Sequence, residues 1–270
     1  MKVKTITVDL WGTLLFDRPS TDNRYKKQRL ADIKTLLSGA GVAVSPGAVD
    51  RAYNGSGVLL RRMWATPRAA AVDGDDNLDA GVYLGRIWPT HRDVPVDHHI
   101  RAILAAVDPA LPRRITPTLM TALVEAYSRP ILVVPPAVDD TALAALESLS
   151  GGGYTLALIS NVMRTPGAAL RRMLERFRLL GYFRHTTFSD EVQIRKPAPE
   201  IFHLTLHAVA GEPGTSVHVG DDPVLDVQGA RGAGMRAIQV ISSRAARGPR
   251  PDLTISRLAE LPEAIEQLES

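Results

Sequence analysis

The stretch Val3-Lys4-Thr5-Ile6-Thr7-Val8-Asp9-Leu10-Trp11-Gly12-Thr13-Leu14 decides the fold. Its first half is rich in β-branched and apolar residues and has no polar cap before it, which predicts a central strand buried on both faces. The strand stops at Asp9, and open α/β sheets bind ligands at the carboxyl ends of their strands. Gly12 and Thr13 follow as a tight turn that lets the backbone come close to a bound group. Taken alone, Asp9 could simply cap this turn.

From about residue 133, short apolar strands alternate with amphipathic helices, which predicts a parallel sheet. We expect strands at 154–159, 182–188, 216–219, 236–241 and 253–255, and helices at 139–149, at 166–180, from the Lys196-Pro197 turn to 210, through Gly229 to 234, and at 262–268. The first strand lies far from these in sequence, yet it needs their sheet to be buried. The segment in between therefore interrupts one domain.

The interrupting segment is helical in period and rich in Arg and Ala. Its capping and breaker residues predict helices at 22–39, from Ser45-Pro46 onward, at 78–88, at 96–107 and at 119–127. The predicted fold class is α/β, with a Rossmann-like parallel sheet core and an inserted α-helical domain. We assign 1–18 and 132–270 to the core and 19–131 to the helical insert.

Composition narrows the class of protein. The chain has 270 residues, 45% of them hydrophobic, which suits a globular protein. Its 32 basic and 29 acidic residues are interspersed, so binding to nucleic acid is not indicated. The absence of cysteine excludes a disulfide framework and a thiolate metal site. The apolar run before Asp9 is too short to span a membrane and lacks a small-residue cleavage site, so we expect a cytoplasmic protein with no membrane partner. We also expect a monomer or a homodimer.

Three predicted strands end on polar groups, at Asp9, at Ser160-Asn161 and at Asp221-Asp222, and Lys196 lies on a turn between the last two. In a parallel sheet these ends lie side by side, so the groups should converge on one crevice. Carboxylates from different strands suit a hard cation, most plausibly Mg²⁺, while an ammonium and a hydroxyl suit phosphoryl oxygens. We therefore expect a magnesium site together with a phosphate site.

The chain resembles the haloacid dehalogenase (HAD) superfamily of hydrolases, in a form with a helical cap inserted after the first motif. Four stretches carry the resemblance: DLWGTL from Asp9, LALIS ending on Ser160, FSDEVQIRKPAPEIF around Lys196, and HVGDDPVLDVQGARGAGM with Asp221 and Asp226. The segment 19–131 matches little that could be named. The resemblance implies a phosphohydrolase acting on a small phosphorylated metabolite.

The resemblance also implies a role for each motif residue. Asp9 would be a nucleophile that forms an aspartyl-phosphate, Ser160 and Lys196 would bind the phosphoryl group, and Asp221 would bind Mg²⁺. The expected metal set is completed by Asp9, the carbonyl of Trp11, Asp222 and the supporting carboxylate of Asp226. Trp11, Thr13 and Asn161 are the candidate substrate contacts.

One position departs from the family pattern. HAD phosphatases carry a second Asp two residues after the nucleophile, where it serves as general acid and base, and here this position is Trp11. An indole cannot transfer a proton at neutral pH. A positioned acid contributes roughly 10²- to 10⁴-fold, so its loss should raise the barrier for an alkoxide leaving group by about 3–5 kcal/mol. Phosphoanhydride, acyl phosphate and phenolate leaving groups should suffer less.

Three alternatives remain open. Trp11 also fits a catalytically weak or non-catalytic member of the family. A 2-haloacid dehalogenase likewise lacks the second Asp, although such enzymes work without the metal that Asp221 would bind. Finally, Asp75-Asp76-Asn77-Leu78-Asp79 spells a DDxxD pattern that resembles the metal-binding motif of prenyl-diphosphate enzymes, whose chemistry needs no general acid; an acidic, solvated turn explains the same residues.

Overall fold

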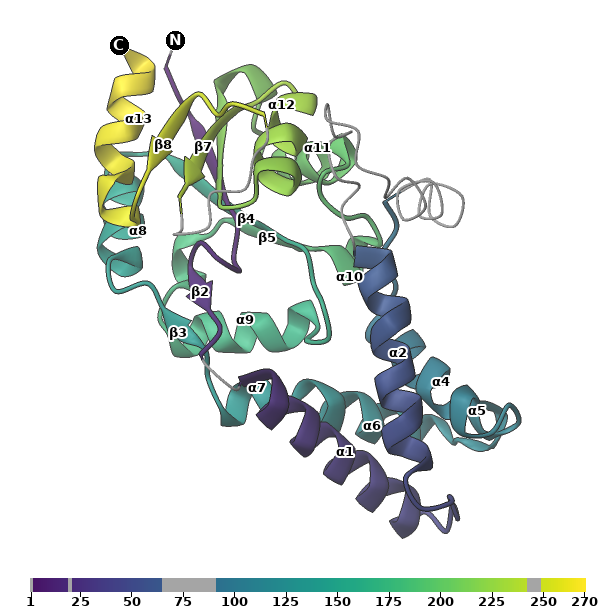
Figure 1. Cartoon of the computed structure of the whole chain (residues 1–270). Coiled ribbons are helices and arrows are strands. Elements are labelled where there is room, and N and C mark those ends of the chain that lie inside the picture. Colours follow the sequence, from purple (N-terminus) through teal and green to yellow (C-terminus); the bar gives the residue numbers. More distant parts are fainter. Residues whose placement is uncertain (1, 19–20, 65–90, 242–248) are drawn as a thin grey trace, which may run out of the picture.

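The computed structural model describes residues 2–18, 21–64 (58–64 as backbone only), 91–241 and 249–270. A six-stranded, all-parallel sheet forms its centre, in the order β5-β4-β1-β6-β7-β8 (Figure 1). The strands are β1 (Thr5–Val8), β4 (Thr155–Ser160), β5 (His185–Phe188), β6 (Ser216–Gly220), β7 (Arg236–Val240) and β8 (Leu253–Ile255). The first strand thus lies between β4 and β6, with neighbours on both sides as its apolar run predicts.

Successive side chains of a strand point to opposite faces of the sheet, so the apolar strands give it two apolar faces. Helices cover both faces and form a separate apolar cluster on each. One cluster joins Leu156 and Leu158 of β4 to α8 (Ala142–Gly151), α9 (Gly167–Arg176) and α13 (Leu261–Glu269). The other joins Ile159 to α11 (Pro199–Ala208) and α12 (Gly229–Gly232). The predicted α/β class with a Rossmann-like core is confirmed. Short helical segments complete this part of the chain: α10 (Ser189–Val192), Leu180–Tyr182, Pro213–Thr215 and Leu258–Glu260.

In the chain the helical insert follows β1 and precedes β4, and in space it lies to one side of the sheet (Figure 1). Its described helices are α1 (Thr21–Gly39), α2 (Ala48–Trp64), α4 (Val96–Val107), α5 (Leu111–Arg114), α6 (Pro117–Ser128) and α7 (Pro130–Val133). Apolar residues between Leu30 and Tyr127 form a core that belongs to the insert alone. The Thr116 side chain accepts a hydrogen bond from the Leu119 amide and caps α6, as Thr116-Pro117 predicts.

The two crossings between insert and sheet are joined by an antiparallel pair that the sequence did not indicate. β2 (Leu15–Phe16) pairs with β3 (Ala137–Val138). The predicted division between 131 and 132 falls inside α7, and the division into 1–18 with 132–270 and 19–131 stays a prediction.

The insert also contacts the core away from these crossings. Arg92 forms an antiparallel bridge with Ile194, and the Asp93 carboxylate accepts hydrogen bonds from Ser189 Oγ (2.5 Å) and Arg195 Nη1 (2.6 Å). All three side chains of this ion-pair cluster are buried. The insert is therefore held at the residues that directly precede Lys196.

Several expected helix ends differ from the observed ones, for local reasons. α2 begins at Ala48 rather than near Ser45, because Gly47 takes a left-handed conformation (φ +72°) in a turn before the helix. α9 ends at Arg176 rather than near Leu180, because Arg178 is left-handed (φ +60°) and Leu179 N donates back to Leu174 O. Within the described residues, no helix combines the length and apolar character needed to cross a lipid bilayer.

Candidate active site

Asp9 lies directly beyond β1, and its carboxylate meets the Lys196 side chain there. Lys196 Nζ donates to Asp9 Oδ1 at 2.5 Å, and both side chains are buried. The amide N of Asp9 donates to Val219 O of β6, which continues the strand pairing and fixes the carboxylate at the carboxyl edge of the sheet. Asp9 and Lys196 therefore meet at the carboxyl edge of the sheet, where the sequence predicts that polar strand ends converge.

Asp226 is the second carboxylate on the same ammonium group. Lys196 Nζ donates to Asp226 Oδ1 at 2.5 Å, and the amide N of Asp222 donates to Asp226 Oδ2 at 2.9 Å. Asp226 belongs to a π-helical segment, Pro223–Gln228, in which both its own amide and that of Val227 donate to Asp222 O. This wide turn brings Asp226 back beneath the end of β6. A Cβ at Gly220 would lie 2.2 Å from Asp226 Cγ, so only glycine fits there.

Asp226 is supported from behind by two buried residues that sequence analysis did not single out. His218 Nε2 lies 3.1 Å from Asp226 Oδ1, and His218 Nδ1 lies 2.8 Å from Thr7 Oγ1. Burial lowers the pKa of His218, so the ring is neutral and donates from Nε2 to the carboxylate. The signal that could have revealed this pair is a histidine in the middle of a strand whose neighbours, Val217 and Val219, are apolar.

Asp221 is the third carboxylate of the site. Ligand oxygens of Asp9, Asp221 and Asp226 all lie within 4.8 Å of one another, a set that could hold a metal ion. Gly12 makes this approach possible, because a Cβ on it would lie 2.4 Å from Asp221 Oδ2 and its φ is +85°. The amide of Gln239 donates to Asp221 O at 3.0 Å and so fixes the backbone at this point.

Three carboxylates lie close together here while one ammonium group pairs with two of them, and their pKa values reflect this. Burial raises the pKa of Asp9 to about 8, against the attraction of Lys196. Burial, together with the charge of Asp226, raises the pKa of Asp221 to about 6. Burial also acts on Asp226, but Lys196 and the hydrogen bond from His218 outweigh it and hold the pKa of Asp226 below its ordinary value. The site has an excess of negative charge that a cation would balance.

Asn161 sets the position of the Lys196 backbone. Lys196 N donates to Asn161 Oδ1 at 2.8 Å, and Asn161 Nδ2 donates to Lys196 O at 3.0 Å. Ser160, the last residue of β4, is buried, and among the described residues its hydroxyl has only a long contact, 3.4 Å to Asn161 O. Asn161 thus binds protein backbone at both ends of its amide, whereas the Ser160 hydroxyl is weakly engaged next to the strand that carries Asp9.

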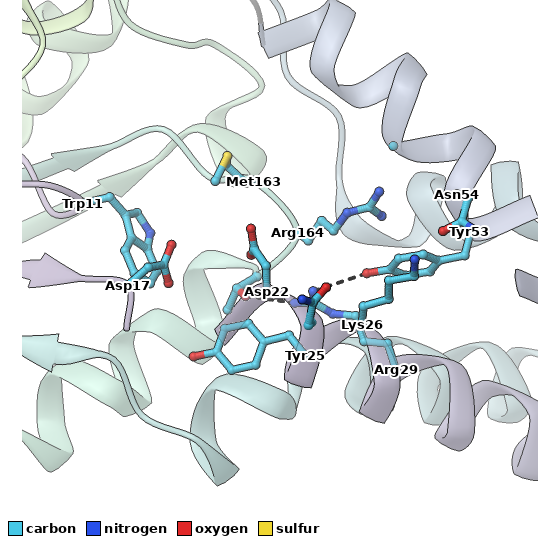
Figure 2. A pocket seen from close by; sticks show the side chains of 13 residues that line it. Trp11, Asp17, Asp22, Tyr25, Lys26, Arg29, Tyr53, Asn54, Met163 and Arg164 are labelled. Atoms are coloured by element: carbon cyan, nitrogen blue, oxygen red, sulfur yellow. Dashed lines mark hydrogen bonds between the residues drawn. The ribbon is translucent and has the colours of Figure 1, made fainter. Parts of the chain in front are cut away.

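The remaining predicted residues lie around this group. Thr13 is buried, and its Oγ1 lies 3.5 Å from Asp9 Oδ2. Trp11 is half-buried and lines a pocket between the sheet and the insert (Figure 2). The Asp222 carboxylate lies apart from the group of three, because its Oδ1 accepts from the amides of Val224 and Leu225 at the start of the π-helical segment. Asp75–Asp79, the DDxxD pattern, falls outside the described residues.

A parallel α/β sheet, a helical insert after its first strand and carboxylates gathered at the carboxyl edge define a class of hydrolases with a capped active site. A model of the haloacid dehalogenase-like hydrolases matches residues 3–234, and the chain belongs to this family. The predicted family, fold and hydrolase class are confirmed.

Individual relatives agree with this placement. Phosphoserine phosphatase of Thermus thermophilus is 35% identical over 116 residues, which cover 40% of this chain and 43% of that protein. The crystal structure of 2-haloacid dehalogenase from Pseudomonas syringae covers 98% of this chain and 99% of its own, with a TM-score of 0.60 at 19% identity. The magnesium-bound HAD-hydrolase YfnB of Bacillus subtilis covers 98% and 99%, with a TM-score of 0.54 at 14% identity. Both structures share the fold.

This chain spans about two fifths of the length of the curated relatives that it matches. The family and the fold therefore follow from the comparisons, while the substrate does not.

Proposed function

We propose that this protein is a Mg²⁺-dependent phosphohydrolase that acts through an aspartyl-phosphate on a small phosphorylated metabolite. One observation carries the proposal: at the carboxyl edge of the sheet the carboxylates of Asp9, Asp221 and Asp226 lie within 4.8 Å of one another, and Lys196 pairs with Asp9 and Asp226. Relatives with phosphatase names, such as the phosphoserine phosphatase of Thermus thermophilus, support this reaction class.

The donor set suits magnesium, which prefers carboxylate and carbonyl oxygens. In our proposal Asp9, Asp221 and the carbonyl of Trp11 hold the ion, and Asp226 supports them. Asp222 contributes through the hydrogen bond that its backbone N–H donates to the Asp226 carboxylate. The space left by the absent side chain of Gly12 supports this assignment, because it lets the 11–13 turn approach the Asp221 carboxylate. When bound, Mg²⁺ would offset the repulsion between these carboxylates and an incoming phosphate.

The reaction proposed for these residues has two steps. A carboxylate oxygen of Asp9 attacks phosphorus, the ester P–O bond breaks, and the leaving oxygen departs with the electron pair. Water then attacks the phosphorus of the acyl phosphate, which releases inorganic phosphate and the Asp9 carboxylate. Lys196 and the Ser160 hydroxyl stabilise the charge on the phosphoryl oxygens, while Asn161 keeps Lys196 in place through two backbone hydrogen bonds. Thr13 and Trp11 border the entering substrate.

The decisive measurement is release of phosphate from p-nitrophenyl phosphate with Mg²⁺ and with a chelator. Asp9→Asn and Asp221→Asn should each lower kcat by at least about 10³-fold, because the first removes the nucleophile and the second a metal ligand. Asp140→Asn, at an exposed carboxylate, is the matched control and should stay within about twofold. Undiminished turnover in chelator, or by Asp221→Asn, would overturn the metal assignment.

Trp11 sets the expected dependence on the leaving group. If no side chain protonates the departing oxygen, wild-type kcat/KM should fall steeply as the leaving-group pKa rises, and Trp11→Asp should accelerate alkyl phosphates far more than aryl phosphates. Because Trp11 also packs against the apolar cluster beside the pocket, a simple loss of contact would slow all substrates alike. A wild-type rate independent of the leaving group, and unchanged by the substitution, would show that another residue supplies the proton.

The same assays separate the alternatives. Release of chloride from 2-chloropropionate without metal would indicate a dehalogenase. Trp11 is consistent with that function because dehalogenases also lack the second Asp, whereas Asp221 is not needed by an enzyme that works without a metal. A protein that binds Mg²⁺ but turns over neither class would be a non-catalytic member.

A further inference from the structure

A cavity of about 340 Å³ lies between the insert and the loop that follows β4. It is lined from α1, from α2 and from residues 163–165, and Trp11 and Asp17 border it on the side of the sheet (Figure 2). Since Trp11 lies two residues after Asp9, a substrate whose phosphate reaches Asp9 would extend its remaining atoms into this cavity. The volume lies at the lower end of small-molecule pockets, which suits a small metabolite.

Arg164 of the loop after β4 is fixed in the cavity by its surroundings. Its guanidinium lies over the Tyr53 ring, 4.4 Å from the centroid, and Nη1 donates to Tyr127 Oη at 2.6 Å and to Ser56 Oγ at 3.4 Å. Within the part of the chain that the structure describes, Nε and Nη2 make no hydrogen bond and no carboxylate pairs with this side chain. Arg164 is therefore oriented in advance, with donors left over.

Arg29 of α1 is a second cation in the same cavity, and it is 4% exposed. Its Nε donates to Tyr127 O (2.7 Å), Nη2 donates to Thr165 Oγ1 (3.1 Å), and the guanidinium lies 4.8 Å from the centroid of the Tyr127 ring. Among the described residues it too has no carboxylate partner. Burying a guanidinium without a counter-charge is costly, and the half-buried Arg164 adds a second positive charge to the same small cavity, so the pair favours an anion there.

Carboxylates do line the cavity, but they do not meet this need. Asp17 and Asp22 form no ion pair with Arg29 or Arg164 among the described residues. Burial, with the charge of Asp22, raises the pKa of Asp17, so that carboxyl group is itself short of cationic partners. The guanidinium groups thus remain available to a ligand.

We infer that Arg164 and Arg29 bind a second anionic group, a carboxylate or a phosphate, of the same substrate whose phosphoryl group is transferred to Asp9. The inference rests on the proposed function and narrows its substrate class to small phosphate monoesters that carry another anionic group. Arg164 provides two free donors in the planar fork that matches such groups, and Arg29 adds charge from behind.

Binding can be measured without turnover, by ligand-induced shifts in thermal unfolding with Mg²⁺ present. Phosphonoacetate carries the second anionic group as a carboxylate, 1,2-ethylenediphosphonate carries it as a phosphonate, and methylphosphonate lacks it. In Arg164→Gln the Kd of the matching bifunctional probe should rise about 10- to 100-fold, and that of methylphosphonate less than threefold. The stronger of the two bifunctional probes identifies the group. Arg172→Gln, an exposed arginine on α9, is the control and should change neither.

Turnover gives the second readout. Wild type should prefer phosphoglycolate to ethyl phosphate by at least 10-fold in kcat/KM, and Arg164→Gln should lose most of this preference through KM. Arg164→Lys retains the positive charge but loses the planar guanidinium that binds an anion through two donors, so an intermediate preference is expected. If Arg164→Gln does not fold, the preference of Arg164→Lys tests the inference instead.

The two levels of the proposal fail in different ways. Hydrolysis of both esters without preference, with equal probe affinities in Arg164→Gln and wild type, would overturn the inference and leave the hydrolase intact. Binding of the bifunctional probes through Arg164 without hydrolysis of any phosphate would overturn the proposed reaction and support the anion site.

Discussion

Single residues at the site act mainly by allowing backbone and carboxylate to come close, and Gly12 is the clearest case. Its φ of +85° and the Cβ distance of 2.4 Å to Asp221 Oδ2 are two separate reasons for glycine. Sequence analysis gave only the general reason, that a tight turn lets the backbone approach a ligand. The identity of the group approached, Asp221, depends on how β6 lies beside β1, which no local pattern contains.

Gly12→Ala should lower kcat by about 100-fold, because Asp221 has to move away from the other carboxylates. Gly153→Ala is the matched control, since Gly153 has a similar φ of +83° and nothing within 4 Å of its added Cβ. Both should lose about 1–2 kcal/mol of stability from the left-handed backbone, and only Gly12→Ala should lose activity. Steady-state kinetics and urea unfolding of the pair test this; equal activities would show that Asp221 tolerates the displacement.

Asp190 gives a pH dependence that can be assigned to one residue. Burial raises the pKa of Asp190 to about 6, although the Gly167 amide donates to its carboxylate. A carboxyl group whose pKa is higher in the folded state stabilises the fold below pH 4 and loses that contribution as the pH rises to about 6.

The free energy of unfolding of wild type relative to Asp190→Asn should therefore fall by about 2–3 kcal/mol between pH 4 and pH 6.5, measured by urea unfolding. Asp140→Asn, at an exposed site, should run parallel to wild type. A difference between wild type and Asp190→Asn that stays constant with pH would exclude a raised pKa at Asp190.

At the scale of elements, the alternation of strands and helices and their approximate positions were predictable, whereas the order of the strands in the sheet and departures from regular geometry were not. The alternation of apolar strands and amphipathic helices fixed the α/β class, and Val96–Val107 has the predicted bounds. The sequence predicts a helix through Gly229 to 234 but gives no sign of the π-helical segment before it, because nothing in Pro223–Gln228 distinguishes i+5 from i+4 hydrogen bonding. That difference decides the placement of Asp226, so its direct contact with Lys196 was beyond the sequence.

The contact between Asp93 and the loop before Lys196 could not be predicted from the sequence either, since Asp93 and Arg195 are far apart in the chain. Asp93→Ala should cost about 3–5 kcal/mol, because Arg195 would remain buried without its carboxylate. Activity should fall as well, since the 193–195 backbone that precedes Lys196 loses its anchor. Asp97→Ala removes a solvent-exposed pair with Arg101 and should cost less than 1 kcal/mol. Equal losses of stability in both variants would contradict the buried ion pair.

At the scale of the whole molecule, the insert has its own apolar core, yet it also contacts the sheet domain. Tyr53 and Tyr127 of the insert contact the Arg164 guanidinium, and the buried Asp93 carboxylate accepts a hydrogen bond from Arg195. Sequence analysis predicted the insert and its position but not these contacts, because side chains from α1, α2 and α6 meet only after the insert has folded. The cavity residues Arg29, Tyr53 and Arg164 therefore had no sequence signal that set them apart from other surface and core residues.

The β2–β3 pair holds the two ends of the insert next to each other, so the insert can be removed by joining these strands directly. Phe16 lies opposite Ala137, so residues 17–136 can be replaced by a short Asn-Gly turn. If the remaining core folds, it should hydrolyse p-nitrophenyl phosphate and no longer discriminate phosphoglycolate from ethyl phosphate, because the partners of Arg164 are gone. Circular dichroism establishes folding, and kcat/KM for the two esters gives the result. A folded core with the full preference would show that the insert does not choose the substrate.

The central position of β1 also governs how the chain must be made. β1 is synthesised well before its neighbours, because Thr5 pairs with Thr155 on one side and with Ser216 on the other. Every residue of the insert's apolar core lies between Leu30 and Tyr127, so this core can close on the nascent chain before either neighbour of β1 has been synthesised. Until then β1 stays unpaired, with its apolar side chains open to aggregation or to a chaperone. The strand that ends at Asp9 is thus made before both of its neighbours and is buried only once they have been made.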